Sequence, residues 1–167
     1  MNTAGSFSRD ANRVPITTDG LIAKRSITFL GGTTDAWGDD GGALDDSALF
    51  TVTGLVTARL VAVCTTLLDG ANATLAVGIT GATTIFIPTE TATQVDAGQI
   101  LLNDAANTTY AIIGEEDAAA DNLPKYLLNG NDIILTVATA NITAGVMDFY
   151  CIWTPISSDG NVEPTTT

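Results

Sequence analysis

The strongest constraint on the fold is an alternation of apolar and polar residues with a period of two near the C-terminal end of the chain. In residues 145–155, GVMDFYCIWTP, every second position is apolar: Met147, Phe149, Cys151 and Trp153. Residues two apart in a β-strand point to the same face of a sheet. In a helix the same four side chains would spread around the axis, so the pattern predicts a strand with one buried face.

Short segments of this kind recur from residue 26 onward, separated by turns rich in Gly, Asn and Asp. The expected strands cover residues 26–30, 49–53, 55–67, 73–80, 84–88, 99–102, 109–113, 132–139 and 145–155. Short strands at this spacing predict an all-β fold, an antiparallel β-sandwich of the jelly-roll kind. We expect the last two strands to form a hairpin around the turn at 141–145.

Other segments lack this alternation and set the expected domain organisation. Residues 1–25 have scattered polar residues and no period, which predicts an extended N-terminal arm ahead of a sandwich spanning residues 26–156. Residues 31–48 form a long Gly/Asp loop within the sandwich, and residues 157–167 read as a C-terminal tail or linker. Residues 115–123, EEDAAADNL, are either a short helix or an acidic loop.

The charge of the chain is large, negative and uneven. The 167 residues carry a net charge of -13, of which residues 1–25 contribute +2 (four basic, two acidic) and residues 26–167 contribute -15 (two basic, seventeen acidic). Such a body is repelled by phosphate backbones and anionic lipid, so we expect neither nucleic acid nor membrane as a partner. Charged residues make up only 15% of the chain, against roughly 25% in ordinary soluble domains. This favours a surface partly covered in an assembly over a merely threonine-rich β surface.

We expect no transmembrane helix, no signal peptide and no disulfide bond. No apolar run approaches the roughly 18 residues of a membrane-spanning helix, and the N-terminal residues lack the apolar segment of a signal peptide. The two cysteines, Cys64 and Cys151, each lie in an apolar strand segment. We therefore expect both to be buried free thiols.

The residue types argue against catalysis. The chain has no histidine, which removes Ser-His-Asp and Cys-His catalysis and the usual zinc sites. Glu115 and Glu116 could serve as paired carboxylates in glycoside hydrolysis. A sugar cleft normally also carries several aromatic platforms, and aromatic residues are only 6% of this chain. We expect a protein that is not an enzyme and that uses no cofactor or metal.

The Gly/Asp loop holds the most unusual surface residues. It contains five acids: Asp35, Asp39, Asp40, Asp45 and Asp46. Carboxylates in a loop could bind Ca²⁺, but the spacing of these acids does not match an EF-hand and favours a solvated acidic loop. Trp37 lies among them. It is either an exposed anchor of a contact loop formed with Asp39 and Asp40, or it folds back on the sandwich. Trp153 continues a core face.

Two long stretches resemble a known class of protein. These are RSITFLGGTTDAWGDDGGALDDSALFTVTGLV at residues 25–56 and DIILTVATANITAGVMDFYCIWTPISSDGNV at residues 132–162. Both resemble small virion proteins from the head gene modules of tailed bacteriophages, which serve as head decoration or cement proteins. The resemblance implies a β-sandwich held on the outside of a capsid, often as a trimer. It carries no defined functional residues.

These observations lead to one functional hypothesis and one alternative. We expect a structural protein that binds and reinforces the exterior of a phage capsid. It would be made in the host cytoplasm. Its partners would be the major capsid protein and further copies of itself, with which it would form a homotrimer. The arm and the residues that join it to the sandwich would supply the contacts. Its apolar side chains would provide the affinity, and its basic side chains would fix the position of the arm on the partner. These residues are Phe7, Arg9, Arg13, Val14, Ile16, Leu21, Ile22, Lys24 and Arg25. The alternative is a receptor- or glycan-binding module of a fibre or tail, which needs aromatic residues in its loops; only Trp37 qualifies.

Overall fold

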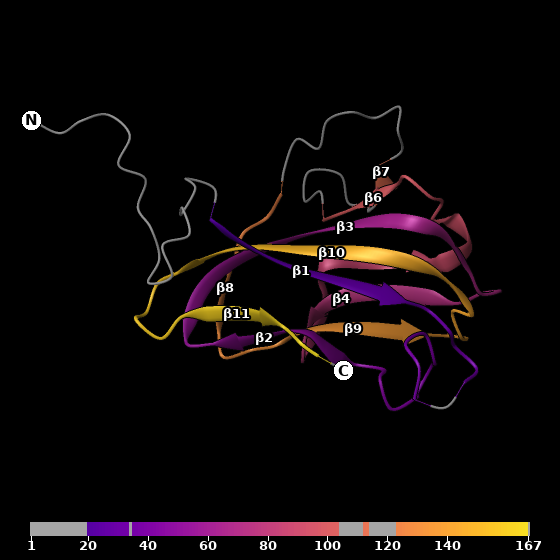
Figure 1. Ribbon diagram of the computed structural model, residues 1–167, viewed down its shortest axis with the longest axis horizontal. Helices are drawn as coiled ribbons and strands as arrows, with labels where there is room; N and C mark the ends of the chain where they lie inside the picture. The colour runs from indigo at the N-terminus through magenta and orange to yellow at the C-terminus, as the bar shows by residue number, and fades with distance from the viewer. Residues whose placement is uncertain (1–19, 34, 104–111, 114–122, 167) are drawn as a thin grey trace, which may run out of the picture.

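The computed structural model describes residues 20–33, 35–103, 112–113 and 123–166. These residues form two antiparallel β-sheets that pack face to face, so the expected β-sandwich is confirmed (Figure 1). The strands in chain order are β1 (Leu21–Thr28), β2 (Ser47–Thr53), β3 (Leu55–Asp69), β4 (Thr74–Ile79), β5 (Ala82–Thr91), β6 (Ile100–Leu101), β7 (Ile112–Ile113), β8 (Tyr126–Asn129), β9 (Ile133–Ala138), β10 (Ala144–Pro155) and β11 (Asn161–Pro164). One turn of 3₁₀ helix, η1 (Ala92–Gln94), follows β5.

Each sheet is built from strands that are distant in sequence. The six-stranded sheet has the order β1-β10-β3-β6-β7, and β8 also pairs with β3; the five-stranded sheet has the order β11-β2-β9-β4-β5. Strands β9 and β10 therefore belong to different sheets, and the hairpin expected around residues 141–145 is wrong. The turn residues there do reverse the chain direction. However, the chain crosses from one sheet to the other and does not form a neighbouring strand in the same sheet.

The core lies between the two sheets and follows the predicted alternation. On β10 the inward residues Met147, Phe149, Cys151 and Trp153 are all buried. The inner faces also contribute large side chains that are fully buried, among them Phe29, Phe50, Phe86, Leu60 and Leu75. Each large apolar side chain removed from water contributes about 1.5–3 kcal/mol, so these inner faces supply the main stabilisation of the sandwich.

The boundary between arm and sandwich differs from the expectation of residue 26. Strand β1 begins at Leu21 and pairs with β10 along its whole length, from Leu21 opposite Trp153 to Thr28 opposite Val146. Its inward positions are Leu21, Ala23, Arg25 and Ile27. The charged Arg25 interrupts the apolar period at this point, which is why the sequence pattern starts five residues too late.

The C-terminal boundary is corrected as well. Residues 161–164, expected to belong to a tail, form β11, which pairs with β2 and places Val162 opposite Val52. Val162 is the only apolar residue in this strand apart from Pro164, so no alternation could reveal it. Strand β8 was also not expected. The segments 1–19 and 114–122 lie outside the described residues, and with them most of the arm and of the helix or acidic loop considered at 115–123.

The long Gly/Asp loop is hydrogen-bonded to the crossover between β9 and β10. The backbone N–H of Gly31 donates to the carbonyl of Ile142 at 2.8 Å, and the N–H of Ile142 donates to the carbonyl of Gly38 at 2.7 Å. Gly38 has φ +107°, and a Cβ there would overlap the carbonyl oxygen of Ile142. The loop therefore depends on a close backbone approach that only glycine permits.

This close approach gives the first testable prediction. Gly38→Ala should lower the free energy of unfolding by at least about 2 kcal/mol, because it adds a clash to an unfavourable φ. Gly41→Ala is the matched control: Gly41 also has positive φ, +69°, but a Cβ there meets nothing within 4 Å. It should cost only about 1 kcal/mol. Urea unfolding of the three proteins measures the difference, and equal losses for the two variants would contradict the docked loop.

Candidate functional site

Arg25, one of the residues expected to contact a partner, lies in the interior of the sandwich. Its side chain is only 6% exposed. The guanidinium donates hydrogen bonds to three backbone carbonyls, those of Thr165 at 2.6 Å, Ala48 at 3.3 Å and Leu49 at 3.5 Å. Burial lowers the pKa of the guanidinium from its ordinary value, but arginine stays charged at neutral pH. The expected contact residue is thus an internal link between β1, the start of β2 and the C-terminal segment.

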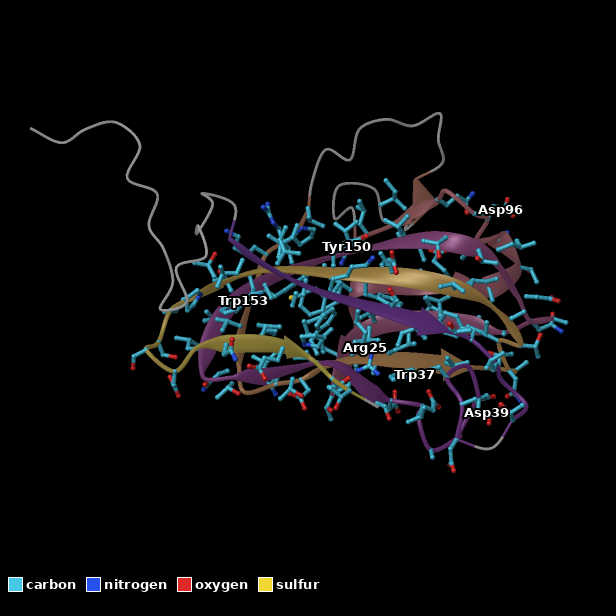
Figure 2. All side chains as sticks on the ribbon, in the orientation of Figure 1. Arg25, Trp37, Asp39, Asp96, Tyr150 and Trp153 are labelled. Carbon is cyan, nitrogen blue, oxygen red and sulfur yellow. The ribbon has the colours of Figure 1, made fainter. Side chains whose placement is uncertain are left out.

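Trp37 completes this link from the opposite side. The Arg25 guanidinium carbon lies 5.0 Å from the centre of the Trp37 ring, within range of a cation–π interaction. Trp37 is 8% exposed, and its carbonyl accepts a hydrogen bond from the N–H of Leu30 at 2.8 Å. Of the two interpretations considered for Trp37, the one in which it folds back on the sandwich is confirmed. Figure 2 shows the two side chains close together between β1 and the Gly/Asp loop.

Lys24 lies on the opposite, outer side of β1 and is partly exposed. Its ammonium forms an ion pair with Asp148 of β10, with Nζ 2.7 Å from Oδ2, and lies 5.3 Å from the centre of the Tyr150 ring. The hydroxyl of Ser26 donates to the other oxygen of Asp148. Hydrogen bonds from Lys24 and Ser26 hold the pKa of Asp148 below its usual value, and Asp148 and Tyr150 raise the pKa of Lys24.

Exposed apolar side chains lie on the same outer face of the six-stranded sheet. Ile22 of β1 stands opposite Ile152 of β10, and Ile152 stands opposite Arg59 of β3. Leu127 lies on β8, beside β3. Ile22 is 67% exposed and Leu127 is 63% exposed, the two highest values among the large apolar side chains of the described residues. We call the following set the apolar–basic patch: Ile22, Lys24, Arg59, Leu127, Tyr150 and Ile152.

The basic side chains of the described residues lie mostly on or beside this face. Within the described residues the basic side chains are Lys24, Arg25, Arg59 and Lys125. Arg25 is buried; Lys24 and Arg59 belong to the patch, and the exposed Lys125 directly precedes β8. The strands of the six-stranded sheet hold two acids, Asp148 and, at the far end of β3, Asp69. Because Asp148 offsets the charge of Lys24, the patch is mainly apolar.

The outer face of the five-stranded sheet has a different composition. Its exposed positions include Thr51 and Thr53 of β2 and Glu163 of β11. Ala138 and Thr136 of β9 are half-buried. None of the six large apolar side chains that are exposed in the described residues belongs to a strand of this sheet. The two faces of the sandwich therefore differ in polarity, and the six-stranded face is the one suited to a protein contact.

The acids of the Gly/Asp loop mostly fold the loop itself. One oxygen of Asp45 accepts a hydrogen bond from the N–H of Val137 at 2.8 Å, and the other accepts from the N–H of Gly41 at 3.0 Å. Asp39 accepts from the N–H of Gly32, and Asp46 accepts from the hydroxyl of Thr136. These acids are exposed or half-exposed, and their hydrogen bonds also hold the loop to itself and to β9.

Asp40 contributes to the loop through its backbone. Its N–H donates to Asn141 Oδ1 at 2.9 Å, and the residue itself is exposed. Asp69 contacts the same crossover as the loop: its carbonyl accepts a hydrogen bond from the N–H of Thr143 at 2.7 Å, next to Ile142, which is bonded to the loop. We call these acids together the acidic end: Asp35, Asp39, Asp40, Asp45, Asp46 and Asp69. Figure 2 shows Asp39 at the end of the sandwich that is remote from Trp153.

The residues predicted to bind a partner are divided by the structure. Ile22 and Lys24 lie on the outer face, whereas Leu21 packs against the core and Arg25 is internal. The other arm residues lie outside the described part of the chain: Phe7, Arg9, Arg13, Val14 and Ile16. Four residues of the outer face were not among the predicted contacts: Arg59, Leu127, Tyr150 and Ile152. One signal was available for them: the run LVAVC at 60–64 is apolar at every position, so it makes both faces of β3 apolar.

Within the described segments, no cluster of chemistry-bearing side chains was found. No three or more Cys, Asp or Glu residues there are placed to hold a metal ion. Cys64 and Cys151 are buried free thiols, as expected. Burial raises the pKa of Cys151 to about 12, so this thiol is unreactive at neutral pH. Among the described residues there is also no helix with the length and apolarity that crossing a membrane requires.

Comparisons with models of protein families, with curated proteins and with solved structures found no match.

The internal position of Arg25 yields a prediction about stability. Arg25→Met should lower the free energy of unfolding by about 2–4 kcal/mol, because it removes charge-assisted hydrogen bonds and takes from the carbonyl of Thr165 the donor that lies 2.6 Å away. Arg25→Lys should recover only part of the loss, since one ammonium cannot reproduce the planar fork of the guanidinium. Lys24→Met is the matched control on the neighbouring residue and should cost far less. Similar losses for Arg25→Met and Lys24→Met in chemical denaturation would contradict the internal role.

The outer ion pair yields a prediction about pH. The folded-state pKa of Asp148 is lowered, so its carboxylate stabilises the fold above its unfolded pKa of about 4. That contribution is lost as the pH falls through the lower folded-state pKa. The gap in unfolding free energy between the wild type and Asp148→Asn should therefore be constant from about pH 8 to about pH 5 and shrink below about pH 4. A gap that persists unchanged at about pH 2 would rule out the charged pair as its source.

Proposed function

We propose that this protein is a structural, non-enzymatic component of a bacteriophage virion that binds and reinforces the outer surface of the capsid. The two stretches that resemble head decoration proteins, residues 25–56 and 132–162, lie side by side in the fold. β1 pairs with β10, and β2 pairs with both β9 and β11. The two similar stretches therefore lie next to each other in the fold. This supports a similarity of architecture as well as of sequence.

The proposal extends to the topology of the sandwich, a jelly roll. In a jelly roll of eight strands, the first, eighth, third and sixth form one sheet and the second, seventh, fourth and fifth form the other. Leaving aside β7, β8 and β11, the observed orders β1-β10-β3-β6 and β2-β9-β4-β5 follow this arrangement. Jelly rolls are frequent among viral capsid and lectin domains, so the strand order is compatible with a virion protein.

One observation carries the functional proposal: the outer face of the six-stranded sheet presents large exposed apolar side chains on an extended β surface. Ile22 and Leu127 are the most exposed, and Ile156, 53% exposed, directly follows β10 at the same end of the sheet. Small ligands are usually bound in concave sites, whereas an extended apolar surface suits another protein. The major capsid protein is the proposed partner, with the protein present as a homotrimer.

The N-terminal arm keeps its role in this proposal, with a revised boundary. Residues 20–25 belong to the sandwich, so the arm comprises residues 1–19. Its apolar side chains, Phe7, Val14 and Ile16, would enter a groove on a neighbouring subunit, and Arg9 and Arg13 would pair with carboxylates there. Ordering the backbone costs about 1–2 kcal/mol per residue, and exposed ion pairs return only about 0–1 kcal/mol each. The apolar contacts must therefore dominate.

The alternative function, binding of a receptor or glycan, receives less support. That interpretation needs aromatic side chains exposed in the loops at one end of the sandwich, and Trp37 was the one candidate. Trp37 is buried against Arg25. The described loops therefore do not offer it as a stacking platform for a sugar.

The experiment that tests the proposed function is reconstitution of the capsid with purified protein. Particles assembled without the protein should bind hundreds of copies of it, counted by mass spectrometry, as a decoration lattice requires. Deletion of residues 2–19 should leave the sandwich folded, since all described strands remain, and should weaken binding by at least about tenfold. Circular dichroism and thermal melting of the truncated protein provide the control for folding. Binding of a handful of copies, or of none, would contradict the proposal.

A further inference from the structure

Gly20, the first described residue, occupies a position at the start of β1 that has no room for a side chain. Its φ is +113°, in the left-handed region, and a Cβ there would lie 2.5 Å from the carbonyl oxygen of Trp153 and 3.1 Å from the hydroxyl oxygen of Thr154. Real Cβ atoms do not approach a backbone oxygen so closely, and the residue is already buried. The chain therefore enters β1 along a path that only glycine permits.

The clash of a side chain at position 20 would be relieved more easily at that residue than in β10. Trp153 is 7% exposed and stands between Leu21 of β1 and Ala58 of β3 in the strand register. Its carbonyl cannot retreat without disturbing both neighbouring strands. Rotation about the backbone bonds of residue 20 instead moves only the chain before it, residues 1–19. Gly20 thus fixes the direction in which the arm leaves the sandwich, and not the arrangement of the strands.

This exit point lies beside the most exposed apolar side chains of the six-stranded face. Ile22, 67% exposed, is two residues further along the chain, in β1. Gly20 approaches Thr154, and Thr154 stands opposite Thr57 of β3. Thr57 in turn stands opposite Leu127 of β8, which is 63% exposed. Neighbouring strands lie about 4.8 Å apart, so three such steps separate Gly20 from Leu127 by about 15 Å. The arm therefore starts at the margin of the apolar–basic patch.

We propose that Gly20 is a positioning residue, which directs the arm so that the arm and the apolar–basic patch meet one continuous surface of the capsid. This role rests on the proposed function, in which both parts attach the protein to the capsid. Two linked contacts bind together with an effective concentration that is highest when their connection matches the distance between their sites. A root held in one direction also lowers the entropy that the arm loses on binding. Gly20, itself buried, thus contributes to affinity through the arm.

The test measures binding of the full-length protein to capsids assembled without it. Gly20→Ala should weaken binding by at least about threefold, because the arm then leaves in another direction. Insertion of Gly-Ser-Gly-Ser between residues 19 and 20 should weaken it similarly, since this linker keeps the glycine and the sandwich but frees the arm to swivel. Gly130→Ala is the matched control: Gly130 also has positive φ, +66°, but a Cβ there meets nothing within 4 Å. It should change binding by less than about twofold.

A double-mutant cycle with the deletion of residues 2–19 separates positioning from a merely structural role. In the truncated chain Gly20→Ala should change binding through the patch by less than about 1.5-fold, because no arm remains to be directed. A glycine that only stabilised β1 would instead give the same loss with and without the arm. The truncated chain itself should keep measurable binding through the patch. Circular dichroism and thermal melting check that each variant is folded.

The outcomes distinguish the role of Gly20 from the proposed function. Wild-type protein that does not bind capsids contradicts the proposed function, and the role of Gly20 falls with it. If the wild type binds, a Gly20→Ala or insertion variant that binds as tightly overturns the role of Gly20 alone. An equal loss from Gly20→Ala in the full-length and truncated chains also overturns it. A truncated chain that no longer binds does the same, because the patch would then add nothing to the arm.

Discussion

The buried guanidinium of Arg25 is the interaction on which the arrangement of the sandwich edge depends. It joins an N-terminal strand to backbone carbonyls of Ala48 and Thr165, which are 23 and 140 residues away in the sequence. A charge in this position is costly unless its donors are satisfied. Arg25 meets that requirement with main-chain acceptors and the face of Trp37, so one side chain fixes β1, β2, the Gly/Asp loop and the C-terminal segment together.

The same residue has a second consequence for the edge of the six-stranded sheet. β1 is the terminal strand in the sheet order, and an edge strand can pair with another chain through its free backbone groups. Inward-pointing charges are one of the devices by which natural sheets oppose such pairing. Arg25 is an inward-pointing charge on an edge strand.

The sequence predicted those parts of the fold where burial follows a simple period. The alternation in β10, the apolar run of β3 and the free buried cysteines were all predicted correctly from local patterns. Failures occurred where long-range contacts override local signals. Arg25 breaks the apolar period of β1, β11 contains a single buried apolar residue, Val162, and the turn before β10 joins two sheets. None of these could be read locally, because each depends on residues far away in the chain.

The candidate contact residues show the same division. Ile22 and Lys24 were predicted to meet a partner and lie on the outer face, whereas Arg25 and Trp37 satisfy each other internally. In a polar sequence context, a basic residue or a tryptophan is expected to be exposed. Arg25 and Trp37 instead contact each other in the fold, and both are buried. Arg59, Leu127, Tyr150 and Ile152 become one surface only through strand register, which the sequence does not give.

Native-state amide hydrogen exchange measures most directly whether β1 and the C-terminal segment are integral to one cooperative sandwich. The backbone N–H of Thr165 donates to Leu49 at 3.1 Å, and the amides of β1 are paired with β10. If they are integral, the amides of Ala23, Arg25 and Thr165 exchange with opening free energies close to those of central amides in β3 and β10. Exchange of these amides faster by about a thousandfold or more, as in a detachable arm, would contradict it.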